Sequence, residues 1–495
     1  MVGVYRERMT TDATDTEAGA DGTTAADSTG DVPDTTEVLI LGGGAGGYVA
    51  AIKAAQRGLD VTLVERDALG GTCLNTGCIP SKAVIHGADI AHEATTAEEL
   101  GISATVDVDM EGLIDWKDGV VAQLTGGIEQ ICQANGVTIV DGIAEFVDDH
   151  HASVTTDDGD HTVEFEYAIV ATGSQPIELP GFAPDGEYVL SSTDILSLSS
   201  MPDELLVVGA GYIGMELSTA LTKLGTDVTV VEMFDDVLPM YDDEISAVVR
   251  EQATELGVDF QFGEAATEWE QVDDGVVVTT ETEDGATSEY AADAVLVVAG
   301  RQPAPDTVAL SAVDIEPTDD GFIPTDAQGR TPHDHIFAVG DVASEPMLAH
   351  TAMYEGAIAA AAIAGDPAAI DTTAVPATVF TDPEIATVGQ TKADAEAAGY
   401  TPVVGKIPLA ANGRARTTAA TDGFVRIVAD EPTGRLLGAQ MVTPDASEMI
   451  GELTVAINAG LDLSAITQTI HPHPTLSEAV MEAAADAQGE SIHTH

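Results

Sequence analysis

The stretch Glu37-Val-Leu-Ile-Leu41, which leads into Gly42-Gly-Gly-Ala-Gly-Gly47, decides the fold of this 495-residue chain. An apolar run enters the spacing G-x-G-x-x-G at Gly42, Gly44 and Gly47, a helix of small residues follows, and a second apolar run ends at Glu65. This is the fingerprint of a dinucleotide-binding fold. Its glycines let a pyrophosphate approach the helix N-terminus, and its acidic residue holds a ribose hydroxyl.

The fingerprint recurs later in the chain. Residues 204–208 lead into Gly209, Gly211 and Gly214, and the following strand ends at Glu232. In both copies the acidic residue stands 23 positions after the first glycine. One G-x-G-x-x-G is weak evidence, because glycine-rich turns also serve packing alone. Two copies in a full strand–helix–strand context predict an α/β protein with two Rossmann-like domains, each with its own dinucleotide.

A cysteine pair lies between the two copies, in Cys73-Leu-Asn-Thr-Gly-Cys78, which is followed by Ile-Pro-Ser-Lys82. The glycine gives the backbone freedom for a small ring, and Pro80 suits the first turn of a helix. Cys78 is therefore expected at a helix N-terminus, where the dipole lowers a thiol pKa. The alternatives are a structural thiol pair or half of a metal site. They are disfavoured because Cys132 is isolated and no Cys/His pair nearby has zinc-ligand spacing.

Charge is the extreme feature of the composition. The chain has 85 acidic and 17 basic residues, a formal net charge of −68. Self-repulsion on this scale destabilises a compact chain unless salt at molar concentration shortens the Debye length to about 3 Å. We therefore expect the high-salt cytoplasm of an extreme halophile and no binding of nucleic acid, which requires basic surfaces. No apolar run reaches the ~18 residues of a membrane span, and no signal peptide opens the chain, so a soluble enzyme is expected.

The redox hexapeptide, the two dinucleotide folds and Gly340-Asp341, in that order, resemble the flavin-dependent pyridine nucleotide–disulfide oxidoreductases over about residues 35–485. Within that group, residues 70–82 and His471-Pro-His-Pro-Thr-Leu-Ser-Glu478 are similar to dihydrolipoyl dehydrogenases. Glutathione reductases usually carry Val in place of Leu74 and Lys in place of Ser81. No cysteine follows Cys132, which excludes the mercuric and large thioredoxin reductase mechanisms.

The resemblance implies roles for individual residues. Cys73 would exchange with the substrate disulfide and Cys78 would face the flavin, while Lys82 would be the cation near the flavin, paired with Glu216. The implied FAD contacts are Gly42, Gly44, Gly47, Glu65, Lys82, Ala144, Asp341 and Ala349. The implied NAD contacts are Gly209, Gly211, Gly214, Glu232, Ala266 and Gly300. Because the carboxylate of Glu232 would repel a 2′-phosphate, and no arginine follows it directly in the sequence, NAD is expected rather than NADP.

A base is needed to take the proton of a dithiol substrate, and His473 with Glu478 fits this need. Imidazole titrates near neutral pH, and a carboxylate fixes its tautomer. From the residues alone Glu478 is equally well explained as the end of a capping box that starts at Thr475. The resemblance favours the dyad, with His471 structural or substrate-lining. In the family the histidine reaches the disulfide of the other subunit, which implies a homodimer.

Composition, sequence pattern and the resemblance together divide the chain into six expected segments. These are a disordered acidic extension (1–35), the first part of an FAD-binding domain (36–182), an NAD-binding domain (183–300), the second part of the FAD-binding or central domain (301–369), an α+β interface domain (370–485) and a tail (486–495).

The implied reaction is oxidation of protein-bound dihydrolipoyl groups with NAD. The lipoyl-bearing partner would be a protein of a 2-oxoacid dehydrogenase or glycine cleavage system. The alternatives are an NADH-fed reductase of another small disulfide and a non-catalytic flavoprotein subunit of a multienzyme assembly. No metal is expected.

Overall fold

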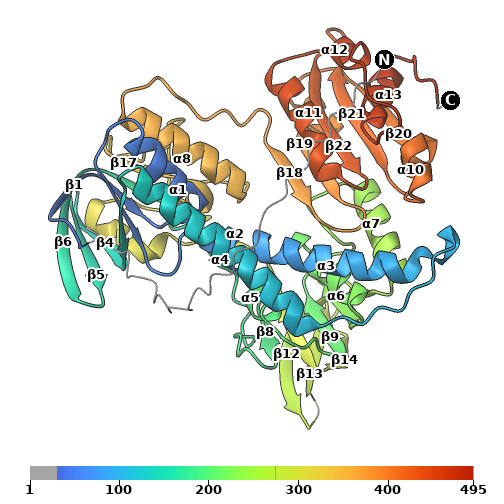
Figure 1. Cartoon of the computed structure of the whole chain (residues 1–495), viewed down its shortest axis with the longest axis horizontal. Coiled ribbons are helices and arrows are strands. Elements are labelled where there is room, and N and C mark those ends of the chain that lie inside the picture. Colours follow the sequence, from blue (N-terminus) through green and yellow to red (C-terminus); the bar gives the residue numbers. More distant parts are fainter. Residues whose placement is uncertain (1–30, 274, 494–495) are drawn as a thin grey trace, which may run out of the picture.

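The computed structural model describes residues 31–273 and 275–493. They form two nucleotide-binding domains and a C-terminal α+β domain, which is drawn in orange and red in Figure 1. Of the acidic extension expected over 1–35, residues 1–30 lie outside this description. None of the helices in the described ranges is both long and apolar enough to cross a membrane.

The first domain is built on a seven-stranded sheet that confirms the first fingerprint. Its strand order is β3-β2-β1-β6-β5-β4, with β17 also paired to β6. The strands β3, β2, β1, β6 and β17 are parallel, whereas β5 and β4 form antiparallel pairs beyond β6. Residues 38–41 of β1 are at most 1% exposed, as a parallel strand covered on both faces requires. The bounds are β1 Thr35–Leu41, β2 Val61–Glu65, β3 Thr138–Asp141, β4 Ile143–Asp148, β5 His151–Thr156, β6 Gly159–Val170 and β17 Ile336–Ala338.

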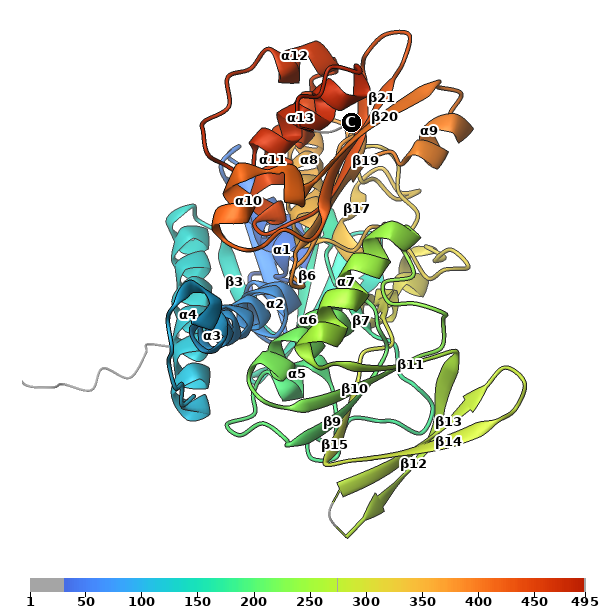
Figure 2. The ribbon, with the colours of Figure 1, turned by 90° about the vertical axis from the view of Figure 1, so that its right-hand side faces the viewer.

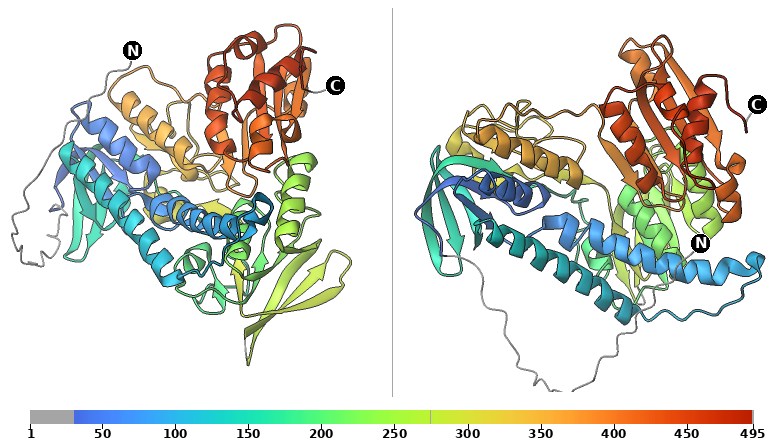
Figure 3. Two further views of the ribbon diagram at one scale, coloured as in Figure 1. Left: turned by 45° about the vertical axis from the view of Figure 1, so that its right-hand side comes forward. Right: turned by 45° about the horizontal axis from the view of Figure 1, so that its top comes forward.

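Helices α1 and α8 lie side by side on one face of this sheet, as both views of Figure 3 show. They come from opposite ends of the domain's sequence, since α1 spans Ala45–Ala55 and α8 spans Ala349–Ile363. Two long helices, α3 (Cys78–Thr96) and α4 (Met110–Ala134), pack on each other, and α3 also contacts α6 of the second domain. The short helix α2 (Gly71–Asn75) precedes α3 directly, so the two cysteines lie where α2 gives way to α3.

The second domain repeats the parallel arrangement with the order β11-β10-β9-β15-β8. A three-stranded antiparallel sheet, β12-β13-β14, projects from it at the lower right of Figure 2. A two-stranded antiparallel pair, β7 with β16, connects the two domains. The bounds are β7 Ser174–Pro176, β8 Val189–Leu190, α5 Ser192–Ile195, β9 Glu204–Val208, α6 Tyr212–Lys223, β10 Asp227–Glu232, α7 Asp243–Leu256, β11 Asp259–Phe262, β12 Glu264–Val272, β13 Gly275–Thr282, β14 Thr287–Ala292, β15 Ala294–Val297 and β16 Arg301–Pro303.

The C-terminal domain confirms the expected α+β unit. Its antiparallel sheet has the order β18-β19-β22-β21-β20, and α11 and α13 pack on it. The expected tail differs from the structure: α13 continues to Ala487, and the N–H of Ile492 donates to Glu482 Oε2 at 3.1 Å. The bounds are β18 Pro376–Val379, β19 Ile385–Gly389, α9 Lys392–Ala397, β20 Pro402–Pro408, α10 Gly413–Thr417, β21 Phe424–Asp430, β22 Leu436–Val442, α11 Ala446–Asn458, α12 Leu463–Thr467 and α13 Glu478–Ala487.

Ion pairs join the C-terminal domain to the rest of the chain. Arg426 Nη1 lies 2.5 Å from Asp242 Oδ2 at the start of α7. Lys223, with a side chain only 4% exposed, lies 2.6 Å from Asp89 Oδ1 and 2.7 Å from Asp382 Oδ2. Burial opposes its charge, but the two carboxylates together raise the pKa of Lys223. These contacts fix the C-terminal domain against α3, α6 and α7.

Candidate functional site

The first glycine turn has the close packing that its sequence predicts. Gly42 has φ +104°, and a Cβ there would lie 2.5 Å from the carbonyl oxygen of Ala171. A Cβ on Gly47 would lie 1.9 Å from the carbonyl oxygen of Gly42, so this glycine brings α1 against the turn. Gly44 is the N-cap of α1 and makes no side-chain cap. The first N–H groups of α1 are therefore available to an anion such as a pyrophosphate.

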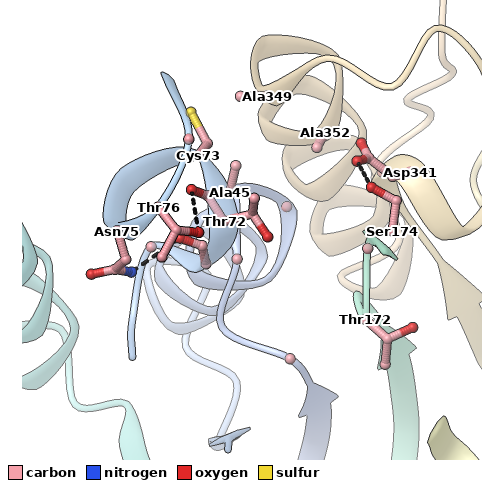
Figure 4. Close-up of a pocket in the computed structure, with 18 of the residues that line it drawn as sticks. Ala45, Thr72, Cys73, Asn75, Thr76, Thr172, Ser174, Asp341, Ala349 and Ala352 are labelled. Carbon is pink, nitrogen blue, oxygen red and sulfur yellow. Dashed lines mark hydrogen bonds between the residues drawn. The ribbon is translucent and has the colours of Figure 1, made fainter. Parts of the chain in front are cut away.

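A cavity of about 660 Å³ lies between this turn and the cysteine pair. It is bordered by α2 on one side and by the segments of Thr172, Ser174, Asp341, Ala349 and Ala352 on the other (Figure 4). Cys73, Cys78 and Glu216 also line it. Of the predicted FAD contacts, Gly42, Gly44, Glu65, Lys82, Ala144, Asp341 and Ala349 line the cavity, and Gly47 packs behind the turn.

The acidic residue of each fingerprint makes the same pair of hydrogen bonds. Glu65 Oε2 accepts from the N–H of Gly43 at 2.5 Å, and its Oε1 accepts from the N–H of Asp67 at 2.9 Å. Glu232 Oε2 accepts from the N–H of Ala210 at 2.6 Å, and its Oε1 accepts from Phe234 at 3.0 Å. Each carboxylate is thus fixed at the end of its strand, beside the glycine turn.

The second turn repeats the geometry of the first. Gly209 has φ +110° and would bring a Cβ within 2.7 Å of Val298 O, while Gly214 would bring one within 2.0 Å of Gly209 O. Gly211 is the N-cap of α6 without a side-chain cap, and a Cβ there would meet nothing within 4 Å. Gly300 is a left-handed residue after β15, at φ +117°. These features fit a second dinucleotide.

Ala266 has a different environment from the other predicted NAD contacts. It lies on β12, is 8% exposed, and packs in the apolar cluster that includes Val231 and Val276. Its side chain is therefore part of the domain core.

Asp341 is held by residues that the sequence analysis did not assign. Ser174 Oγ donates to Asp341 Oδ2 at 2.6 Å, and this hydroxyl accepts from Arg301 Nε at 2.8 Å. All three side chains line the cavity. The only feature of the sequence that points to Ser174 and Arg301 is that each directly follows a glycine at the end of an apolar strand.

Cys78 is the first residue of α3, at a helix N-terminus as predicted, and Cys73 lies in the short helix α2. Both are in the thiol form. A hydrogen bond from Cys73 lowers the pKa of Cys78, burial opposes this, and Lys82 contributes further, so that the pKa of Cys78 falls to about 7. The same hydrogen bond, together with burial, raises the pKa of Cys73 well above its usual range. Cys78 is therefore the more acidic thiol of the pair.

The predicted ion pair between Lys82 and Glu216 is present. Lys82 Nζ donates to Glu216 Oε2 at 2.6 Å and lies 4.7 Å from the centre of the Phe380 ring. Glu216 Oε1 accepts from the N–H of Phe380 at 2.9 Å. Both polar side chains therefore have fixed positions at the cysteine end of the cavity.

The predicted dyad is also formed. His473 Nδ1 lies 2.9 Å from Glu478 Oε1, and the N–H of Thr475 donates to Glu478 Oε2 at 2.9 Å. One carboxylate thus serves the imidazole and half of a capping box. The other half is absent, because Thr475 Oγ1 donates to Pro472 O and α13 begins only at Glu478.

The two histidines of this segment differ in exposure. The side chain of His473 is 79% exposed, and this residue is not among those that line the cavity. The side chain of His471 is 5% exposed, and its Nε2 lies 3.0 Å from Glu452 Oε1. A buried, paired imidazole of this kind is consistent with the expectation that His471 is structural or substrate-lining rather than the base. His473 instead presents its free ring nitrogen to the outside of the chain.

Two family models match the chain. Residues 36–356 match "Pyridine nucleotide-disulphide oxidoreductase", and residues 375–484 match the dimerisation domain of the same family. The chain belongs to the pyridine nucleotide-disulphide oxidoreductase family. Enzymes of this family use FAD and NAD(H), and both glycine turns fit these groups. The match to the dimerisation domain implies that this family member is a homodimer.

Relatives of this family member cover nearly its full length. "Dihydrolipoyl dehydrogenase 2" of Haloarcula marismortui is 59% identical over 94% of this chain and 99% of its own. The "Dihydrolipoyl dehydrogenase" of Haloferax volcanii is 57% identical over the same shares. The solved structure of LpdA from Mycobacterium tuberculosis is 32% identical with a TM-score of 0.85, over 91% of this chain and 99% of that one.

Proposed function

We propose that this protein is a dihydrolipoyl dehydrogenase, which oxidises protein-bound dihydrolipoyl groups to lipoyl groups with NAD⁺. The observation that carries the proposal is the cysteine pair at the junction of α2 and α3, which lines the cavity that the first glycine turn borders. The names of relatives at 56–59% identity support the same substrate. We assign residues 36–182 and 301–369 to FAD binding, 183–300 to NAD binding and 370–485 to the dimer interface.

The chain's own residues have separate tasks in this reaction. A substrate thiolate attacks Cys73 Sγ of the Cys73–Cys78 disulfide, a mixed disulfide forms, and Cys78 leaves as a thiolate. A leaving thiol of low pKa departs faster, and the pKa of Cys78 is about 7. The second substrate thiolate then attacks the substrate sulfur of the mixed disulfide. This closes the lipoyl ring and releases Cys73 as a thiolate. His473 takes the proton of the first substrate thiol, releases it to solvent, and then takes the proton of the second.

The remaining residues bind and orient. Glu65, Asp341 and the glycine turn before α1 would hold FAD, and Glu232 with the turn before α6 would hold NAD. Bound FAD would supply two-electron transfer between the dithiol and the nicotinamide. Lys82, fixed by Glu216, places a positive charge beside Cys78 and stabilises its thiolate.

We propose that His473 serves the cysteine pair of the partner subunit. The imidazole is exposed and does not line this chain's own cavity, while its tautomer is fixed by Glu478. The substrate protein that the homodimer acts on would be a lipoyl-bearing protein of a 2-oxoacid dehydrogenase or glycine cleavage system. We place the enzyme in the cytoplasm of a halophile, because its net charge is −68 and relatives come from Haloarcula and Haloferax.

A second candidate is a reductase of another disulfide. The solved RclA of Escherichia coli, a "flavoprotein disulfide reductase", is 28% identical with a TM-score of 0.81. A steady-state assay in ~2–4 M KCl, the range of strongest screening, separates the two. Dihydrolipoamide with NAD⁺ should be turned over at least a hundredfold faster than glutathione disulfide with NADH or NADPH. Faster reduction of the glutathione disulfide would overturn the proposal.

A further inference from the structure

Asn75, inside the ring between the two cysteines, has its whole side-chain amide engaged. Its Nδ2 donates to the carbonyl oxygens of Leu69 and Gly71, both at 3.0 Å, and lies 3.4 Å from that of Ala68. Its Oδ1 accepts from Thr125 Oγ1 at 3.0 Å. Figure 4 shows the amide of Asn75 directed toward the chain that precedes Thr72. A side chain within the redox ring thus bonds to two other segments.

The first of these segments lies directly against the glycine turn. The N–H of Gly70 donates to the carbonyl oxygen of Gly43 at 2.9 Å. A Cβ on Gly71 would lie only 2.7 Å from Gly44 Cα, so the two backbones are in contact. Residues 68–71 therefore have a fixed position relative to the turn that borders the cavity. Because Asn75 donates to Leu69 and Gly71, its hydrogen bonds also hold the cysteine ring in place relative to the glycine turn.

The second segment is the long helix α4. Thr125 is 50 residues from Asn75 in sequence and does not line the cavity. Its hydroxyl binds the amide oxygen, whereas residues 68–71 bind the amide nitrogen. Because the amide then has partners for both its oxygen and its nitrogen, the ring can shift only if several hydrogen bonds break together.

We propose that Asn75 is a positioning residue for the redox pair, which holds Cys73 and Cys78 at bonding distance and in a fixed place relative to the FAD turn. The inference rests on the proposed function, because it requires that the two cysteines form a reversible disulfide. Asn75 reacts with neither substrate nor sulfur. Its loss lowers the effective concentration of one thiol toward the other, which makes the disulfide easier to reduce.

The test is the thiol–disulfide equilibrium of the full-length protein in ~3 M KCl, the molar range of strong screening. The Cys73–Cys78 disulfide exchanges with dithiothreitol, giving two protein thiols and cyclic dithiothreitol, and alkylation after an acid quench reports the reduced fraction. For Asn75→Ala we expect a shift of about tenfold toward the dithiol, or roughly 30 mV. For Thr125→Val we expect a smaller shift in the same direction, about threefold, because it acts on the ring only through Asn75.

Asn135→Ala is the matched control, since Asn135 lies at the end of α4 and its Nδ2 donates to Ile131 O at 2.7 Å. Its equilibrium should equal that of the unmodified protein. Equilibria for both Asn75→Ala and Thr125→Val within twofold of the unmodified value would overturn the inference. Should Asn75→Ala not fold, Thr125→Val alone decides. If the unmodified protein forms no reversible Cys73–Cys78 disulfide, the proposed function itself fails.

Discussion

Lys82 and Glu216 form an ion pair of 2.6 Å that connects α3 of the first domain to α6 of the second. The Glu216 carboxylate is buried, and its second oxygen accepts from the N–H of Phe380, where the C-terminal domain begins. Three parts of the chain therefore meet next to Cys78. Lys82 lowers the pKa of Cys78 and Glu216 raises it, so the two charges act on the thiol in opposite directions.

Substituting each member of this pair should move the Cys78 pKa in opposite directions. Lys82→Met should raise it from about 7 by about one unit, because the nearby cation is lost. Glu216→Gln should lower it, because the opposing carboxylate is neutralised. The pH dependence of iodoacetamide alkylation of the reduced protein measures both, since the raised pKa of Cys73 keeps that thiol unreactive near neutral pH. Lys53→Met, on the exposed face of α1, is the charge control.

His473→Gln should reduce dihydrolipoamide oxidation by about 10²–10⁴-fold, the usual contribution of a general base. Glu478→Gln should cost less, about tenfold, because the imidazole remains but loses its fixed tautomer. Burial disfavours the Glu478 charge, but the hydrogen bonds from Thr475 and His473 outweigh it and lower the pKa of Glu478. The carboxylate therefore stays ionised at neutral pH. Activity at pH 6–8 measures these effects.

The control for the dyad is His493→Gln, which removes another exposed imidazole that is paired with a glutamate of α13. His493 Nδ1 lies 3.2 Å from Glu482 Oε1. This variant should keep full activity. A loss of activity equal to that of His473→Gln would show that pairing a histidine with a glutamate of α13 is needed for structure alone, and would contradict the dyad.

The equivalent carboxylates Glu65 and Glu232 should affect different cofactors. Glu232→Gln should raise the KM for NAD⁺ about tenfold and leave bound flavin unchanged, because it weakens the ribose contact of the second turn only. Glu65→Gln should lower the flavin-to-protein ratio after dialysis. Each variant is the matched control of the other, because the two carboxylates make equivalent hydrogen bonds. Each accepts from an N–H of its own glycine turn and from the N–H of the residue two positions after the glutamate itself. Loss of flavin from Glu232→Gln would contradict the assignment.

The parts of the fold that depend on local sequence were predictable. The strand expected over 204–208 is β9, with identical bounds, and the strand expected to end at Glu232 is β10. The position of Cys78 at a helix start also followed from Pro80. In each case the determinant is a glycine, a proline or an apolar run within a few residues, so no tertiary contact is needed to recognise it.

The contacts that complete the site were not predictable in this way. Asp341 is held through Ser174 by Arg301, and these residues come from three separate segments of the sequence. Thr125 meets Asn75 only because α4 packs beside α2. Such pairings depend on how the helices and sheets pack, and a single sequence carries no record of that packing. The exposure of His473 has the same origin.

The protein should lose structure when salt is removed. At ~0.1 M KCl the Debye length is about 10 Å, against about 3 Å at ~1 M, so carboxylates across the surface of a chain with net charge −68 repel one another far more strongly. Far-UV circular dichroism and sedimentation in a KCl titration measure the loss of helix and of the dimer. NaCl at equal ionic strength should protect as well as KCl does, whereas sucrose, which does not screen charge, should not. Full activity and unchanged dichroism in ~0.1 M KCl would contradict this account of the charge.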